Sequence, residues 1–479
     1  MPIAALGEYA PIFPEIFLAV SAMLLLMYGV FAGEDESEIS GWIGIVLLVA
    51  TGFFIVNQGD ATAQLADGAV IVDPFARFMK LLILAGSAFA LILSFDYLRS
   101  AKILKFEFPV LVLLSTVGMM LMASANNLIS LYLALELQSL ALYVLAAFRR
   151  DSVFSAEAGL KYFVLGALSS GLLLYGCSLV YGFTGTTSFA GIASVLAGSE
   201  RSIGLIFGLV FIMAGVAFKL SAVPFHMWTP DVYQGAPTPV TAFLAAGPKV
   251  AAFAMLIRLV QDAFPAAASD WKQIVIAISV GSMVLGAFAA IGQTNIKRLM
   301  AYSSIGHVGY ALVGLSTGTP EGIQGVLIYL AIYVPMTLGT FACILAMRRG
   351  DTYIEDIAEL SGLSRRQPML AFMLAMLLFS MAGIPPLAGF FAKFYVFLAA
   401  IQSGLFWLAV VGVVTSVISA FYYLAIISKM YFQEPAEAFE PMTAKLRFVL
   451  AVMGIITLFL FIPLNLLVTV ADAAARSLF

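Results

Sequence analysis

The sequence predicts an all-α polytopic membrane protein, and three observations support this fold class. The chain of 479 residues is 62% hydrophobic and only 11% charged, with a mean hydropathy of +1.04. Soluble domains carry about 25% charged residues, so this composition excludes a soluble protein. The apolar residues form runs long enough to cross a bilayer, which takes roughly 20 residues of helix. Several of these runs also contain a proline or a charged residue.

About 14 apolar runs follow one another along the chain, separated by polar or Pro/Gly-rich breaks. They are residues 12–31, 41–57, 75–97, 107–124, 127–148, 157–183, 203–223, 239–263, 272–292, 297–315, 321–347, 368–400, 405–430 and 446–470. An even number of spans predicts that both termini lie on the same side of the membrane.

The distribution of lysine and arginine predicts how these spans are oriented. Loops after odd-numbered spans hold most of the loop cations, which are Arg99, Lys102, Lys105, Arg149, Arg150, Lys297, Arg298, Arg348, Arg349, Arg365, Arg366, Lys429, Lys445 and Arg447. The opposite loops and the C-terminus hold mainly Arg201, Lys272 and Arg476. Because cytoplasmic loops are rich in Lys and Arg, we expect the termini on the non-cytoplasmic side.

The longest polar connection begins at Arg348 and reads RRGDTYIEDIAELSGLSRRQP. Ile354, Ile357 and Leu360 would share one face of a helix, so this segment predicts a short amphipathic helix on the cytoplasmic surface. A solvated connector without such a helix is the alternative interpretation.

Several kinds of site find no support in the sequence. The net charge of −3 is small and thinly spread, which gives no indication of nucleic-acid binding. Cys177 and Cys343 both lie in apolar runs and have no metal-ligand spacing. The chain has no phosphate-binding loop, CxxC pair, haem-binding pair or dinucleotide fingerprint. We therefore expect no catalytic residue, metal or redox cofactor in this chain.

The strongest functional signal is the stretch 215–250, GVAFKLSAVPFHMWTPDVYQGAPTPVTAFLAAGPKV. Lys219 and Lys249 lie in apolar runs, and an ionisable group at membrane depth costs about 3 kcal/mol or more. Pro224 cannot continue an ordinary helix, because its ring clashes with the preceding turn and it lacks an N–H. This pattern predicts a broken membrane helix that carries a charge, with His226 just past the break. The onset of a loop at Pro224 is the alternative.

Other spans also contain ionisable residues. Glu136 lies in the middle of span five, and His307 lies about a third of the way into span ten. Lys393 follows a break at Pro385 and Pro386 in span twelve. Lys161 opens span six, close enough to its end that the side chain could instead reach the cytoplasmic interface. Taken together, these groups predict a path for protons, although each one alone could be part of a structural ion pair.

The two breaks predict an internal repeat, because paired breaks in corresponding halves are typical of transporters. Spans four to eight and nine to thirteen would be the repeats, with the breaks in the fourth span of each. Glu136 and His307 would then each lie in the second span of their own repeat. Lys219 and Lys393 would each lie in the fourth span. The predicted division is 1–106, an N-terminal three-helix segment, 107–263 and 272–432, the two five-helix repeats, and 433–479, a C-terminal helix.

Three stretches carry a resemblance to a known family. KLSAVPFHMWTPDVYQGAPTPVTAFLAAGPK, NIKRLMAYSSIGHVGY and MAGIPPLAGFFAKF resemble the antiporter-like membrane subunits of respiratory complex I and of multisubunit cation/proton antiporters. The resemblance covers nearly the whole chain. Within the family, Lys393 in place of a glutamate and the LALELQSLALYVL context of Glu136 favour one particular subunit of complex I. The long lateral helix that marks the largest antiporter-like subunit is absent from the sequence.

The resemblance implies a fold of 14 transmembrane helices, with two inverted five-helix repeats and breaks in helices 7 and 12. It also implies a role in proton translocation for Glu136, Lys161, Lys219, His226, Lys249, His307 and Lys393. In the family, the residues that match Glu136 and Lys219 form a pair. Lys249 matches the central lysine and Lys393 the terminal one, and the two histidines match positions that connect these groups through water.

The implied function is proton pumping coupled to electron transfer from NADH to quinone. FMN, iron–sulfur clusters and quinone would be bound by other subunits. The implied partners are those subunits, including neighbouring antiporter-like and small membrane subunits, and membrane lipids. The implied location is the bacterial inner membrane. Three alternatives use the same residues differently: a subunit of a Na⁺/proton antiporter complex, a transporter of an organic solute, and a scaffold with inert ion pairs.

Overall fold

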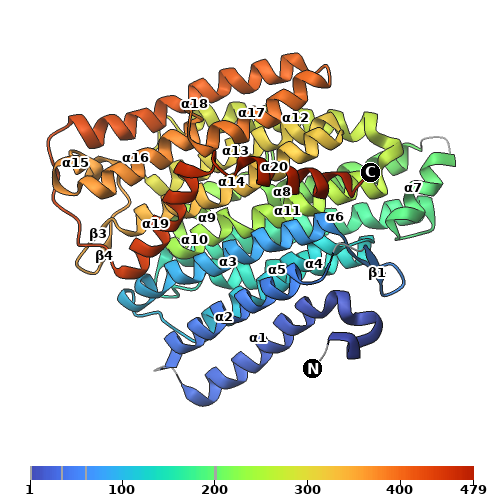
Figure 1. Cartoon of the computed structure of the whole chain (residues 1–479), viewed down its shortest axis with the longest axis horizontal. Coiled ribbons are helices and arrows are strands. Elements are labelled where there is room, and N and C mark those ends of the chain that lie inside the picture. The colour runs from blue at the N-terminus through green and yellow to red at the C-terminus, as the bar shows by residue number, and fades with distance from the viewer. Residues whose placement is uncertain (1–2, 34–35, 60–61, 199–201) are drawn as a thin grey trace.

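A computed structural model describes residues 3–33, 36–59, 62–198 and 202–479. The chain forms a bundle of long helices that lie side by side, from α1 and α2 at one edge to α18 at the other (Figure 1). The N- and C-termini both lie toward the same end of this bundle (Figure 1). The long helices are α1 (Phe13–Ala32), α2 (Ser37–Val56), α3 (Pro74–Ser100), α4 (Glu107–Ser124), α5 (Leu128–Ala146), α6 (Val153–Thr184), α8 (Ile203–Leu220), α12 (Ala268–Ala289), α13 (Ile296–Thr317), α14 (Pro320–Leu345) and α18 (Phe406–Phe432).

The remaining elements are shorter and lie at breaks or in connections. The short helices are η1 (Ile3–Ile12), α7 (Phe189–Gly198), α9 (Trp228–Gly235), α10 (Thr238–Ala245), α11 (Gly247–Arg258), η3 (Leu259–Ala263), η4 (Pro265–Ala267), η5 (Ile357–Leu360), α15 (Leu363–Arg366), α16 (Pro368–Ala382), α17 (Ala388–Gln402), α19 (Ala444–Phe459) and α20 (Leu464–Arg476). Two small antiparallel hairpins pair β1 (Ala63–Leu65) with β2 (Val70–Val72) and β3 (Arg348–Arg349) with β4 (Thr352–Tyr353).

The helical membrane fold predicted from the sequence is confirmed, but the number of 14 spans is not. In the described part of the chain, 11 helices are long and apolar enough to cross a membrane, or 12 if α19 and α20 count as one span. Those two helices meet at an angle of 89°, so the predicted straight span 446–470 is bent. The predicted span 368–400 is divided into α16 and α17, which have 15 residues each.

Besides the bent pair α19–α20, three more spans in the described part of the chain are interrupted. α8 ends at Leu220 and α9 begins at Trp228, with Pro224 between them. α16 ends at Ala382 and α17 begins at Ala388, with Pro385 and Pro386 between them. Both breaks were predicted from the prolines. The third separates α10 from α11 at a single residue, Ala246, whose φ of −107° and ψ of −90° are not helical. No proline stands at that position, so the sequence analysis missed this break.

The connector after α14 does not form the predicted amphipathic helix. It folds into the β3–β4 hairpin followed by the short helices η5 and α15. Ile357 and Leu360 are buried, as expected for an apolar face, but the helix that carries them has only four residues. Asp356 forms a bridge to Asn295, which holds the connector against the start of α13.

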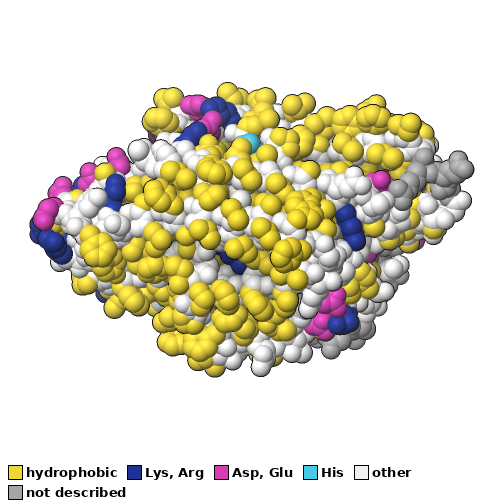
Figure 2. Space-filling view, turned by 90° about the horizontal axis from the view of Figure 1, so that it is seen from above, with side chains coloured by type: hydrophobic (Ala, Val, Ile, Leu, Met, Phe, Trp, Pro, Cys, Tyr) yellow, Lys and Arg dark blue, Asp and Glu magenta, His cyan; other side chains and the backbone are white. Residues whose placement is uncertain are grey.

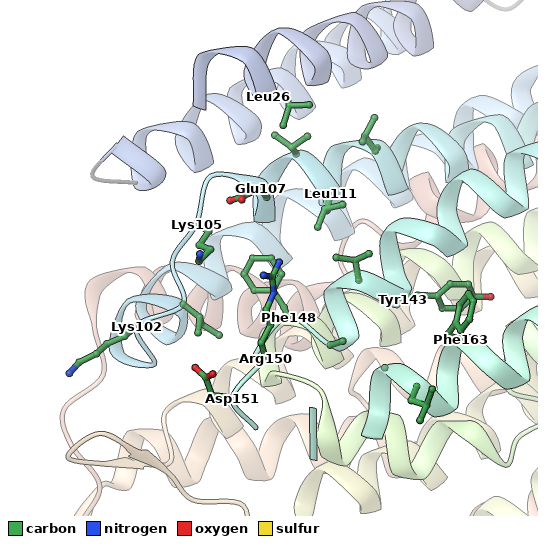
Figure 3. Close-up of a pocket in the computed structure, with 17 residues that line it drawn as sticks. Leu26, Lys102, Lys105, Glu107, Leu111, Tyr143, Phe148, Arg150, Asp151 and Phe163 are labelled. Carbon is green, nitrogen blue, oxygen red and sulfur yellow. The ribbon is translucent and has the colours of Figure 1, made fainter. Parts of the chain in front are cut away.

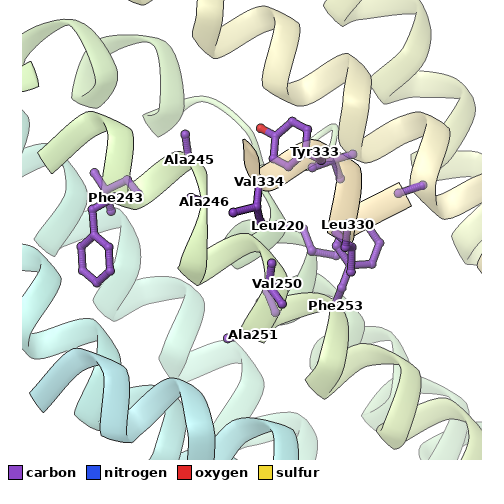
Figure 4. Packing of buried hydrophobic residues seen from close by; sticks show 14 of the residues in the cluster. Leu220, Phe243, Ala245, Ala246, Val250, Ala251, Phe253, Leu330, Tyr333 and Val334 are labelled. Atoms are coloured by element: carbon purple, nitrogen blue, oxygen red, sulfur yellow. The ribbon is translucent and has the colours of Figure 1, made fainter. Parts of the chain in front are cut away.

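The central helices are shielded from the surroundings by the outer ones. In the most apolar stretch of the α10–η3 span, 100% of the residues are buried, and in that of α14 94% are buried. In the corresponding stretch of α1, only 28% are buried. Figure 4 shows this core, with Leu220, Val250 and Phe253 packed near Leu330 and Val334. The outer surface carries many apolar side chains, as expected for contact with lipid or partner helices (Figure 2). Any ionisable residue in the core is therefore remote from bulk water.

Candidate functional site

Lys219 lies in the last turn of α8 and points toward α5. Its Nζ donates to Ser139 Oγ at 2.7 Å and to Tyr143 OH at 3.3 Å. The same nitrogen lies 5.3 Å from the ring centre of Tyr143 and 5.8 Å from that of Tyr162. Aromatic faces attract a cation, so the site stabilises the ammonium group without a carboxylate.

Glu136 stands one helical turn before Ser139 on α5 and is half-buried. Its carboxylate accepts a hydrogen bond from Ser170 of α6. The sequence analysis expected a pair between Glu136 and Lys219, but the described residues show no ion pair between their charged atoms within 4.0 Å. Ser139 contacts Lys219 directly and lies on the same helix as Glu136. The two charges therefore share one neighbourhood without direct contact.

Lys249 lies at the start of α11, just after the irregular Ala246. Its Nζ donates to the backbone oxygen of Leu220 at 2.7 Å and to Ser221 Oγ at 2.6 Å. These acceptors are at the C-terminal end of α8, where helix carbonyls lack partners and the helix dipole is negative. The ammonium group of Lys249 thus connects the interrupted span α10–α11 with the interrupted end of α8.

Lys393 makes the corresponding contacts at the other proline break. From the second turn of α17, its Nζ donates to the backbone oxygens of Met381 at 3.1 Å and Ala382 at 2.9 Å. It also donates to Ser416 Oγ of α18 at 2.7 Å and lies 4.8 Å from the ring centre of Tyr310. Lys393 therefore stabilises the C-terminal end of α16.

The two proline breaks place their lysines differently from the simple match made on the sequence. Lys219 comes before the break in its span, whereas Lys393 comes after it. In its contacts, Lys249 is the residue equivalent to Lys393, because each donates to the end of a preceding half-helix. Only the contacts could reveal this, since Lys249 belongs to the next span along the chain.

His307 occupies the space between Lys249 and Lys393. Its Nδ1 is 2.6 Å from Tyr329 OH of α14, and its Nε2 is 3.3 Å from Tyr423 OH of α18. A small cavity of about 10 Å³ is lined by Lys249, His307 and Tyr329, among others. That is close to the space that one water molecule needs.

Hydroxyl groups continue the polar contacts from His307 toward Lys393. Tyr423 OH lies 2.5 Å from Ser303 Oγ, and Tyr310 OH lies 3.3 Å from Ser419 Oγ. Because the ring of Tyr310 also covers Lys393, the polar groups extend from α8 across α11 and α13 to α17. We call Lys219, Lys249, His307 and Lys393, with the hydroxyl groups between them, the polar row.

Two of the predicted residues lie outside the polar row. Lys161 is 40% exposed and pairs with Glu157 and with Asp231 of α9, each at 2.7 Å. Asp231 also binds Arg298 of α13 at 2.6 Å, so this cluster joins three helices. His226 lies half-buried in the turn between α8 and α9, and its Nδ1 has no hydrogen-bond partner among the described residues.

The chain contains further buried cations that the sequence analysis did not single out as a group. Lys80 of α3 pairs with Glu15 of α1, and both side chains are buried. Arg258 of α11 donates to both carboxylate oxygens of Asp73 at 2.9 Å. Both positions lie within or beside predicted spans, so a search for charges near span ends could have found them.

The buried cations thus fall into two classes by partner. Lys80, Arg258 and Lys297 each pair with a carboxylate, and the distance from Lys297 to Glu355 is 3.0 Å. Lys219, Lys249 and Lys393 are only 5%, 1% and 6% exposed, yet the described residues offer none of them a carboxylate oxygen within 4.0 Å. Their partners are hydroxyls, backbone oxygens and aromatic faces. The arrangement suits groups that gain and lose a proton.

The larger hollows lie beside the polar row. One of about 880 Å³ opens between α1, α4, α5 and α6, with Lys102, Lys105 and Arg150 toward one end and Tyr143 and Phe163 toward the other (Figure 3). A second, of about 510 Å³, lies between α17 and α18 and reaches Lys393 and Ser416. Among the described residues, no group of three or more His, Cys, Asp or Glu side chains could hold a metal ion.

Comparison with known proteins bears on what this arrangement does. Residues 125–419 match a family described as "NADH:quinone oxidoreductase/Mrp antiporter, TM". Over 477 residues the chain is 57% identical to NADH-quinone oxidoreductase subunit N of Parvibaculum lavamentivorans, covering 99% of each chain. It is 58% identical to NADH-quinone oxidoreductase subunit N 1 of Rhizobium meliloti, covering 97% of each. The chain belongs to this family.

Solved structures of family members share the fold. A chain of respiratory complex I from Thermus thermophilus with bound Aureothin superimposes with a TM-score of 0.82 at 34% identity, covering 96% of this chain and 99% of that one. A chain of the Mrp complex from Dietzia sp. reaches a TM-score of 0.84 at 22% identity, which shows a common fold alone. The resemblance noted in the sequence is therefore confirmed, and the high-identity relatives favour NADH-quinone oxidoreductase over the Mrp antiporter.

Proposed function

We propose that this chain is the proton-translocating subunit N of a bacterial NADH-quinone oxidoreductase, and that the polar row carries the protons. The observation that carries the proposal is the set of three buried lysines without a carboxylate partner, in contrast to Lys80, Arg258 and Lys297, which each have one. The names of the high-identity relatives supply the reaction of the complex to which such a row would be coupled. The chain is a multi-pass membrane protein, and the inner membrane is the location that fits a bacterial complex of this kind.

The driving event would occur outside this chain. We infer that FMN, iron–sulfur clusters and quinone are bound by other subunits of the complex, because this sequence has no motif for them. A charge change near Glu136 would then alter the proton affinity of Lys219, since charges interact strongly in a medium of low dielectric constant. Ser139 and Ser170 fix the positions of the two charges relative to each other.

Transfer along the row would follow the contacts. Lys249 donates to Leu220, the residue next to Lys219, so the two ammonium groups meet the same turn of α8. The small cavity between Lys249 and His307 would supply a water molecule as the next carrier. Tyr310, whose ring lies near both His307 and Lys393, offers a hydroxyl between them, and the proton would leave from Lys393. Lys161 and His226, at the edge of the row, would serve its connection to the cytoplasm.

Each half of the chain would supply one part of this path. We propose residues 107–263 and 272–432 as inverted repeats, supported by the equivalent contacts that Lys249 and Lys393 make with the ends of α8 and α16. Residues 1–106 and 433–479 would flank them. We place the termini on the non-cytoplasmic side, because the termini lie at the end of the bundle opposite β3 and α15, where Arg348, Arg349, Arg365 and Arg366 lie (Figure 1).

The decisive experiment is Lys219→Ala in the native membrane, with the amount of assembled complex measured first. We expect NADH-driven quinone reduction and proton uptake into inverted vesicles to fall together, because coupled redox turnover requires the row. The matched control is Arg366→Ala, which removes an exposed cation and should leave both rates unchanged. Normal rates in assembled Lys219→Ala complex would show that the charge is structural. Dependence of proton uptake on Na⁺ would instead favour a cation/proton antiporter.

A further inference from the structure

Each of the three row lysines donates to one serine hydroxyl. The distances are 2.7 Å from Lys219 to Ser139, 2.6 Å from Lys249 to Ser221 and 2.7 Å from Lys393 to Ser416. The serines come from α5, from the break after α8, and from α18, so none lies on the helix of its lysine. No repeat or spacing in the sequence links the six residues.

The choice of a hydroxyl has a chemical consequence. A serine hydroxyl both donates and accepts hydrogen bonds, whereas a backbone oxygen or a carboxylate only accepts. The ammonium form of lysine has three donors and no acceptor, and the neutral amine gains a lone pair that accepts. A serine can therefore keep its hydrogen bond to the lysine nitrogen before and after the proton leaves, by rotating its hydroxyl hydrogen.

The remaining contacts of the row lysines do not have this property to the same degree. Apart from their serines, Lys249 and Lys393 contact backbone oxygens of the preceding half-helix, which accept N–H bonds but cannot donate a hydrogen bond to the lone pair of the neutral amine. Lys219 has a second hydroxyl, that of Tyr143, at the longer distance of 3.3 Å. Lys80, Arg258 and Lys297 pair with carboxylates instead. The serine contact is thus what distinguishes the row lysines from the other buried cations.

We propose that Ser139, Ser221 and Ser416 are positioning residues of the proton row, each holding its lysine nitrogen in place in both protonation states. The inference rests on the proposed function of the lysines. Without the hydroxyl, the lone pair of a deprotonated Lys249 or Lys393 would have no donor among the contacts described above, and the nitrogen would shift toward the backbone oxygens that still accept its N–H groups. The next proton would then meet a nitrogen at the wrong distance, which slows transfer rather than binding or assembly.

Ser416 gives the sharpest test because its surroundings allow three matched variants. Ser416→Ala removes the hydroxyl, and Ser416→Thr keeps it while adding a methyl group, for which the hollow of about 510 Å³ beside Lys393 has room. Thr415→Val removes the hydroxyl of the preceding residue, which donates to Val411 and Gly412 of its own helix and does not contact Lys393. At the second lysine, Ser221→Gly removes the hydroxyl and tolerates the φ of 63° found there.

The measurement is the initial rate of NADH-driven proton uptake by inverted vesicles with equal amounts of assembled complex. We expect Ser416→Ala to lower the rate about tenfold, the factor that corresponds to one hydrogen bond to a charged group. We expect Ser416→Thr, which keeps the hydroxyl, and Thr415→Val, which does not remove the lysine contact, to have the wild-type rate. Ser416→Ala has no further effect when Lys393→Ala is already present, because the serine acts through that lysine.

Two results would separate the serine inference from the function on which it rests. If Lys393→Ala abolishes uptake but Ser416→Ala does not reduce it, the inference on serine is wrong and the proton row stands. An equal loss in Thr415→Val would also overturn the inference, since any missing hydroxyl on α18 would then suffice. If Lys393→Ala itself has normal uptake, the proposed role of the row fails.

Discussion

At the scale of the residue, the partner of a buried cation separates structure from function. Arg258 and Asp73 are 1% and 2% exposed and form a two-pronged ion pair, while Asp73 also caps α3 by accepting from the backbone nitrogen of Ala76. A buried pair of this kind is costly to break, because the remaining charge is left without a partner. The row lysines have no such pair to lose, so their removal leaves no unpaired carboxylate and should cost less stability than removal of Asp73.

Asp73→Ala should therefore destabilise the protein strongly. It leaves the Arg258 guanidinium short of a carboxylate and removes the cap of α3, and we expect a loss of about 3–5 kcal/mol. The measurement is thermal unfolding of the purified complex. A melting temperature equal to that of the wild type in Asp73→Ala would contradict this account.

The cluster around Asp231 predicts a pH dependence outside the apolar spans. Burial raises the pKa of Asp231, but the hydrogen bonds and charges of Lys161 and Arg298 outweigh it, so the pKa is lowered from its ordinary 3.8. A lowered carboxyl pKa contributes stability above the ordinary value, and this stability is lost as the pH falls through the lowered one. Asp231→Asn should lower the melting temperature at neutral pH, and the difference from the wild type should shrink below pH 4 or so. A constant difference at all pH values would exclude this origin.

At the scale of the element, the breaks in the helices place the row. Ser221 and Gly383 interrupt their spans, and the free carbonyls that result are the acceptors for Lys249 and Lys393. An unbroken helix would have used those carbonyls internally. The break therefore supplies the acceptors for the lysine, and the lysine supplies the donor that the freed carbonyls need.

Gly389 allows the two halves of the broken span α16–α17 to approach each other. A Cβ at this position would clash with the backbone oxygen of Ser380. The backbone N–H of Gly389 also donates to Ser380 Oγ at 3.0 Å, which keeps the two half-helices close together. Gly389→Ala should push α17 away from α16, at a cost of about 1–3 kcal/mol, and draw Lys393 from its acceptors. We expect slower proton uptake and a lower melting temperature. Gly171→Ala is the control, because a Cβ there meets no atom within 4 Å; equal effects of both changes would refute the argument.

At the scale of the whole molecule, the two ends of the bundle differ in charge, and this difference predicts its orientation. Arg366 lies exposed near β3 and α15, and Ser477 lies exposed near the C-terminus. An impermeant thiol reagent should label Arg366→Cys in inverted vesicles and Ser477→Cys in right-side-out vesicles. Background labelling should be low, since Cys177 and Cys343 are buried. The reverse pattern would invert the proposed topology.

Much of the fold was predictable because apolar runs and prolines act locally. The long helices and the breaks at Pro224 and at Pro385 follow from residues that lie within them. The bend between α19 and α20 has Pro463 beside it, and Gly247 and Pro248 directly follow the break at Ala246, but these residues were not used as break signals because proline is also common at the start of an ordinary helix. The ionisable members of the row were found from their cost in an apolar run. Their serine and tyrosine partners were missed, because such residues are common in membrane helices and only the tertiary contacts select them.

The direction of the polar row relative to the membrane determines how much electrical work each step of proton transfer requires. Lys219, Lys249, His307 and Lys393 come from neighbouring helices that run side by side, so the row crosses the bundle from helix to helix (Figure 1). Moving one charge across a membrane potential costs about 2.3 kcal/mol per 100 mV, but a step parallel to the membrane plane costs almost none of it. The electrical work is therefore concentrated in the two legs that join the row to either side of the membrane. A change in membrane potential should act on proton uptake and release, and leave transfer between the lysines largely unaffected.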